Sequence, residues 1–155
     1  MESIEGPADE LRELERSEAA PYINQPSAPF WLAPVFGSWF AAYVAAFALW
    51  NVSIGLFILS MVALSAVIGL FVGSLVRQYD TLPMPGRGNP PPEIRREYRV
   101  YGSGAALIGG LVVVGWRFAG LGLAVALAFV LVSVGYHVYV RRYENAAEAV
   151  RERLQ

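Results

Sequence analysis

The position of its carboxylates is the feature that most constrains this sequence. All 13 Asp and Glu residues lie within residues 2–18, 80–97 and 144–152, so residues 19–79 and 98–143 contain none. A soluble protein carries charge over its whole surface, with about 25 % charged residues on average. This chain has 16 % charged and 55 % apolar residues. We therefore predict that lipid surrounds both acid-free stretches, and the composition does not fit a soluble enzyme.

Four apolar runs inside these stretches have the length of membrane helices. They cover residues 33–50, 54–76, 100–116 and 118–140. A hydrocarbon core of about 30 Å needs about 20 helical residues, with about 17–25 tolerated, and backbone groups in lipid must be satisfied within helices. Only residues 51–53 separate the first two runs and only Arg117 separates the last two. The sequence thus predicts an all-α polytopic membrane protein whose four transmembrane helices form two tandem hairpins, 33–76 and 100–140.

The arginines predict the orientation of these hairpins. Residues 77–99 contain five arginines and residues 141–155 contain four, whereas Arg117 alone lies on the opposite side. The side richer in arginine faces the cytoplasm in most membrane proteins. We therefore expect a multi-pass protein of the cell membrane, plasma or inner, with both termini in the cytoplasm.

Three segments remain outside the predicted spans. Residues 1–32 form an acidic arm that contains prolines, and we expect it to be largely disordered. Residues 77–99 form a cytoplasmic loop rich in Arg and Pro. Residues 141–155 are predicted to form an amphipathic helical tail that is mainly solvated, with Tyr143, Ala147, Val150 and Leu154 on one face.

Small residues at four-residue spacing mark the faces that suit helix packing. Helices in lipid associate by close backbone approach, which small side chains permit. The sets are Gly37, Ala41 and Ala45; Ser65, Gly69 and Gly73; Gly102, Ala106 and Gly110; and Gly120, Ala124 and Ala128. We expect these faces to pack mainly within the chain. Interfacial anchors are predicted at Trp31, Trp50, Trp116, Arg77, Arg99, Arg117, Arg141 and Arg142.

Residues able to do chemistry are scarce. The chain has no cysteine, and no Asp, Glu or Lys falls within a predicted span, so transport coupled through a buried carboxylate has no candidate residue. No serine is accompanied by a base, and we predict neither catalysis nor a metal or cofactor site. His137 is the only histidine and the only candidate ligand for a cofactor. No basic face suited to nucleic acid is present.

The sequence leaves three functions open. The first is a non-catalytic accessory or scaffold subunit of a larger membrane-protein complex, whose partners are the lipid bilayer and either other membrane subunits or copies of itself. The second is a small homo-oligomeric four-helix channel or transporter. The third is a membrane anchor associated with haem or quinone, of which the haem version would depend on His137.

Overall fold

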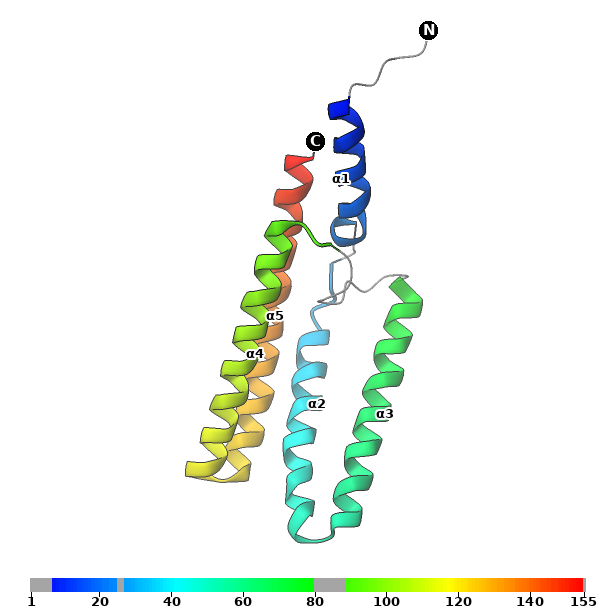
Figure 1. Cartoon of the computed structure of the whole chain (residues 1–155). Helices are drawn as coiled ribbons and strands as arrows, with labels where there is room; N and C mark the ends of the chain where they lie inside the picture. Colours follow the sequence, from blue (N-terminus) through cyan, green and yellow to red (C-terminus); the bar gives the residue numbers. More distant parts are fainter. Residues whose placement is uncertain (1–6, 25–26, 80–88, 155) are drawn as a thin grey trace.

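The computed structural model describes residues 7–24, 27–79 and 89–154, and these residues form helices joined by short connections. The elements are α1 (Pro7–Ile23), α2 (Leu32–Ala46), the 3₁₀ helix η1 (Phe47–Asn51), α3 (Ile54–Tyr79), α4 (Pro92–Ala119) and α5 (Leu121–Arg153) (Figure 1). Four helical stretches, Leu32–Asn51, Ile54–Arg77, Pro92–Ala119 and Leu121–Arg153, are long and apolar enough to cross a membrane. The predicted all-α class with four such helices is confirmed.

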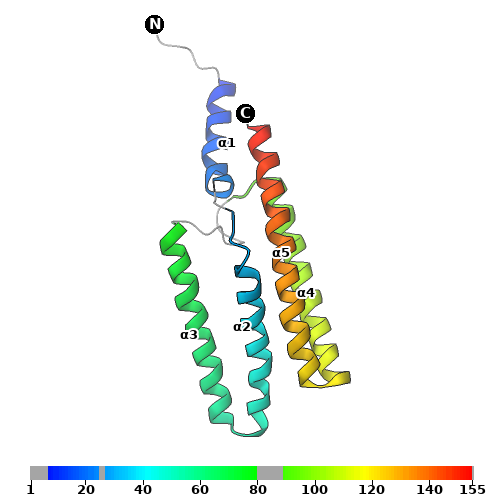
Figure 2. The same ribbon diagram turned by 180° about the vertical axis from the view of Figure 1, so that it is seen from behind.

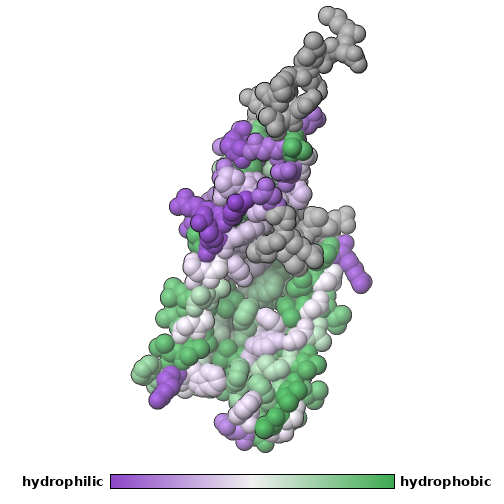
Figure 3. Space-filling view, viewed as in Figure 1, coloured by the Kyte–Doolittle hydropathy of each residue, from purple (hydrophilic) through white to green (hydrophobic). Residues whose placement is uncertain are grey.

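Helix α5 is the element against which most of the others pack. Both α2 and α4 lie along it, and α1 lies against its C-terminal part, whereas α3 contacts mainly α2 and η1. The turns that follow α2 and α4 lie at the end of the molecule opposite to α1, as the two views agree (Figures 1 and 2). Apolar residues cover the surface at the turn end, and hydrophilic residues gather around α1 (Figure 3). The charged end is therefore also the end that joins α1 to α5.

Local sequence explains where the helices start and stop. α4 begins at Pro92, where a missing N–H costs nothing, and Glu93 in its first turn suits the positive end of the helix dipole. Ser53 precedes α3, and its hydroxyl accepts a hydrogen bond from the Leu56 N–H at 3.4 Å. The turn between α4 and α5 is at Gly120, whose φ of 85° favours glycine. This differs from the sequence prediction, because Arg117 lies within the last turn of α4.

The N-terminal arm also differs from the prediction. Residues Pro7–Ile23 form α1 rather than a largely disordered segment, while residues 1–6 and 25–26 lie outside the described part of the chain. The composition of the arm alone predicts disorder because it contains few apolar residues. Three of those residues, Ala19, Tyr22 and Ile23, are buried against α4 and α5. Contacts with residues distant in the sequence therefore supply the apolar burial that the arm cannot achieve by itself.

Gly37 allows the close approach of α2 to α5. A Cβ atom at this position would collide with the Ser133 hydroxyl and would lie 2.6 Å from the carbonyl oxygen of Phe129. Two small residues of α5, Ala124 and Ala128, are also buried, with only 0 % and 2 % exposed. Two helix backbones can approach this closely only where side chains are absent or reduced to a methyl group.

We expect Gly37→Ala to lower the free energy of unfolding by about 1–3 kcal/mol, because the added methyl group meets a backbone atom that cannot rotate away. The measurement is unfolding by sodium dodecyl sulfate in mixed micelles, followed by circular dichroism. Gly69→Ala is the matched control, since a Cβ atom there has no neighbour within 4 Å. Equal effects of the two substitutions would contradict the packing of α2 on α5.

Candidate functional site: a three-helix junction at the charged end

Four of the twelve predicted packing residues are buried between helices, and the other eight are not. Gly37 and Ala41 of α2 are buried, as are Ala124 and Ala128 of α5, whereas Ala45 is exposed and Gly120 forms the turn. The other two sets have a different environment. A Cβ atom at Gly69, Gly73, Gly102 or Gly110 would have no neighbour within 4 Å, and Ser65 and Ala106 are exposed. The small-residue faces of α3 and α4 are thus left open.

Of the predicted interfacial residues, the three tryptophans, Arg77 and Arg117 lie near helix ends, whereas Arg99, Arg141 and Arg142 lie within α4 and α5. The rings of Trp31, Trp50 and Trp116 are partly exposed and make edge contacts with Phe71, Phe57 and Phe47, respectively. Arg77, Arg99, Arg117 and Arg141 are exposed. Arg142 differs from them, because it forms an ion pair with Glu97. His137, the candidate ligand, is exposed on α5, and no group of three His, Asp or Glu side chains in the described ranges is placed to hold a metal ion.

Aromatic side chains hold α3 to α2. The indole N–H of Trp39 donates a hydrogen bond to the Leu64 carbonyl at 3.1 Å, and the Tyr43 hydroxyl bonds to the Ser65 hydroxyl. Buried indole and phenol groups need such partners, above all in lipid. Sequence reasoning missed both residues. The available signal was their position four residues apart in the middle of a span, away from the interfaces where Trp and Tyr usually lie.

Among the described residues, the largest fully buried side chains lie outside the apolar half, in what we call the junction: α1, residues 92–98 of α4, and residues 142–153 of α5 together with Leu154. Ile94 and Val150 are both 0 % exposed and pack with the buried residues Ala19, Tyr22 and Ile23 of α1. The face predicted for residues 141–155 is the one that enters this cluster. The tail is therefore packed between two helices rather than mainly solvated.

Arginines join α1 and α5 at their ends. The Arg151 guanidinium donates to the carbonyl of Ile23, through Nε at 2.9 Å and through Nη2, and Arg16 donates to the carbonyl of Leu154 at 2.5 Å. The last carbonyls of a helix lack partners within that helix and carry the negative end of its dipole. Each of the two antiparallel helices thus supplies a cation to the C-terminal end of the other.

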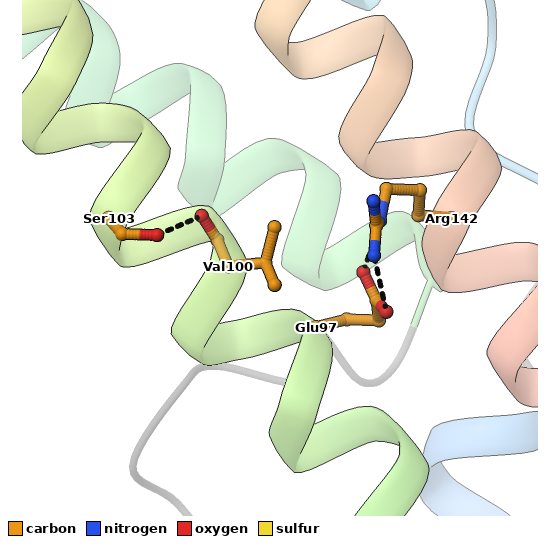
Figure 4. A network of polar contacts seen from close by, with 4 residues as sticks. All are labelled: Glu97, Val100, Ser103 and Arg142. Carbon is orange, nitrogen blue, oxygen red and sulfur yellow. Dashed lines mark hydrogen bonds and ion pairs between the residues drawn. The ribbon is translucent and has the colours of Figure 1, made fainter.

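A bidentate ion pair joins α4 to α5 beside the cluster (Figure 4). Arg142 donates to both carboxylate oxygens of Glu97, at 2.6 and 3.1 Å, and the Glu97 side chain is only 11 % exposed. Glu97 precedes the apolar stretch that begins at Val100. The hydrogen bonds from Arg142 lower the pKa of this carboxyl from its ordinary value of 4.5, although partial burial opposes them. One turn further along α4, Ser103 bonds back to the carbonyl of Val100 at 3.0 Å.

Arg153 connects all three parts of the junction. Its guanidinium lies 2.5 Å from the carboxylate of Glu15 on α1 and 3.2 Å from that of Glu93 on α4. Exposed ion pairs contribute little each. Their arrangement nevertheless directs the acidic α1 toward the tail of α5. This tail carries three arginines that contact α1 or α4, namely Arg142, Arg151 and Arg153. The junction thus holds helices together and offers no nucleophile with an adjacent base.

Comparison with known proteins adds no family to this description. The chain matches no protein-family model, no curated protein sequence and no solved structure.

Substituting Glu97 by Gln is expected to lower the free energy of unfolding by about 1–3 kcal/mol, the usual loss when a charged hydrogen-bonded group is removed. Because the folded state lowers the pKa of Glu97, its contribution is complete above pH 4.5 and is lost as the pH falls through the folded-state pKa. Thermal unfolding of the detergent-solubilised protein between pH 3 and 7 measures this, with the exposed Glu152→Gln as control. An identical acid dependence in wild type and Glu97→Gln would contradict this role.

Proposed function

We propose that the chain is a non-catalytic accessory or scaffold subunit of a larger membrane-protein complex. In this proposal the four apolar helices cross a cell membrane as two tandem hairpins, and both termini and the junction lie in the cytoplasm. The orientation is supported by the arginines, nine of which lie in residues 77–99 and 141–155. The turn at residues 51–53 and the turn at Gly120 then face outward.

The open face of α3 carries this proposal. No residue in the apolar window of α3 is buried within the chain, and the helix is attached mainly through α2 and η1. Gly69 and Gly73 have free space where a side chain would be. Lipid can cover such a surface, but two glycines one turn apart make it suited to close contact with another helix. We therefore assign to α3 the contact with a neighbouring membrane subunit.

The polar pair between α2 and α3 favours the homo-oligomeric channel or transporter as the second candidate. The hydroxyls of Tyr43 and Ser65 bond to each other in the apolar half, and Ser65 is exposed. Polar groups at this depth are costly in lipid and are often kept for transport. Several copies with Ser65 directed at a common axis would place hydroxyls along a path. Flux of a tested ion or solute through vesicles that contain only this chain would favour this function.

Affinity purification from native membranes tests the subunit proposal. We expect wild type to retain a second membrane protein in a fixed ratio, and Gly69→Ile together with Gly73→Ile to lose it because bulky side chains prevent close approach. Val67→Ile is the matched control, since Val67 is exposed on the opposite side of α3. A chain recovered alone, or only with copies of itself, would contradict the proposal.

The orientation has a separate test that uses the absence of cysteine. Val52→Cys places one thiol in the first turn, where Val52 is 74 % exposed, and Glu152→Cys places one in the exposed tail. We expect a membrane-impermeant maleimide to label Val52→Cys in intact cells and to label Glu152→Cys only after lysis. The reverse pattern, or equal labelling of both thiols in intact cells, would contradict the proposed orientation.

A further inference from the structure

A cleft lies between α5 on one side and the end of α1 together with residues 27–28 on the other. Its volume is about 390 Å³. Its α5 side is a single helical stripe that starts at Tyr136 and ends at Arg151. This stripe is about 22 Å long at 1.5 Å per residue. The opposite side is formed by the end of α1 at Tyr22 and Ile23 and by residues 27–28.

One end of the cleft is lined by tyrosine rings in fixed positions. Tyr136, Tyr139 and Tyr143 follow one another along the stripe. Each ring packs on an aromatic ring of another helix, with centroid distances of 5.0, 4.6 and 6.3 Å to Phe36, Tyr101 and Tyr98, respectively. The faces and edges of these rings are therefore held in place without a ligand. Tyrosine rings held in this way attract cations through their quadrupole.

The other end of the cleft carries two carboxylates without a cation. Glu144 and Glu148 lie one turn apart on the stripe, where like charges repel each other. Among the described residues neither forms an ion pair, although Glu15, Glu93 and Glu97 of the junction all do. Arg151 also lines the cleft, but it donates to the carbonyl of Ile23. The cleft thus presents an excess of negative charge to any occupant.

The position of the cleft points to a lipid. The stripe crosses the end of the apolar run at Val140, so Tyr136 lies in the apolar half and Glu148 lies outside it. In the membrane placement proposed above, Glu144 lies about 6 Å beyond Val140 along the helix, at the level of the lipid headgroups, and Glu148 lies about 12 Å beyond it, at their outer edge. An amphiphile can place its acyl chains beside Tyr136 and its headgroup beside Glu144 and Glu148.

We propose that this cleft binds a phospholipid whose headgroup carries an ammonium group, such as phosphatidylethanolamine. The ammonium lies beside Tyr143, the tyrosine next to the acids, and bonds to Glu144 and Glu148, which gives the unpaired acids a partner. An anionic headgroup without an amine, such as that of phosphatidylglycerol, meets two carboxylates there and is disfavoured. The inference rests on the proposed membrane placement and is independent of the subunit role of α3.

Native mass spectrometry of the full chain, purified in detergent and supplied with equal amounts of phosphatidylethanolamine and phosphatidylglycerol, tests the proposal. We expect wild type to retain mainly phosphatidylethanolamine. The double variant Glu144→Gln and Glu148→Gln is expected to bind it about tenfold more weakly, because it loses the charge that the ammonium requires. Glu152→Gln is the matched control, since this acid lies on the same helix but does not line the cleft.

Two results would overturn the proposal. One is equal retention of both lipids by wild type, and the other is unchanged retention by the double variant while circular dichroism reports the same helix content. Free phosphoethanolamine distinguishes the source of the ammonium. Stabilisation by the free compound equal to that by the lipid would assign the cleft to a soluble amine instead. If the cysteine labelling contradicts the proposed orientation while wild type still retains phosphatidylethanolamine selectively, the orientation is overturned and the cleft assignment stands.

Discussion

The close approach of α2 and α4 to α5 is the interaction on which the remaining structure depends. Ala124 and Ala128 of α5 are buried, and Gly37 of α2 leaves space for the backbone at Phe129. In lipid there is no hydrophobic drive that pulls one apolar helix toward another, so this fit of small residues must supply the attraction. Once α2 and α4 are placed on α5, the charged ends of α4 and α5 are also adjacent, and the ion pair between Glu97 and Arg142 can form.

The exclusion of charge from lipid explains why the ion pairs gather at one end. Every ion pair of the described residues involves Arg142 or Arg153, both beyond the apolar part of α5. The acidic α1 meets Arg153 through Glu15 and adds three buried apolar residues to Ile94 and Val150. The protein thus has an apolar half held by small residues and a charged half held by a compact cluster, and α5 runs through both. The tyrosine-lined cleft lies where the two halves meet.

Much of the fold can be predicted from the sequence, because a helix in lipid must be long, apolar and free of acids. The acid-free stretches locate all four long helices, and the four-residue spacing identifies Gly37, Ala41, Ala124 and Ala128, which the structure buries. The sequence does not reveal which helix faces which. Because α2 and α3 are adjacent in the sequence, their small residues would be expected to contact each other. In the structure Trp39 and Tyr43 fill the space between these two helices, and the small residues of α2 face α5 instead. That choice depends on shape complementarity between segments that are nearly 100 residues apart.

The junction and the cleft are harder to predict for the same reason. Ala19, Tyr22 and Ile23 are too few to stabilise α1 alone, and their partner Val150 is far away in the chain. The position of the last turn is a smaller matter of backbone geometry. Gly120 can adopt a positive φ at little cost, whereas Arg117 continues the helix. The sequence prediction places the turn at Arg117 because of its charge alone. Glu144 and Glu148 attract attention only once the structure pairs Glu15, Glu93 and Glu97 with arginines and shows that these two acids line the cleft.

Hydrogen–deuterium exchange of the full chain in lipid nanodiscs tests the central claim, which is that α5 joins a lipid-embedded half to a folded junction. The comparison is between wild type and Val150→Asp, a substitution that places a charge in the buried cluster. We predict slow exchange across α1 in wild type, fast exchange of α1 in the variant, and no change in α2 and α3. Exchange of α1 at the rate of an unstructured peptide in wild type would contradict this account.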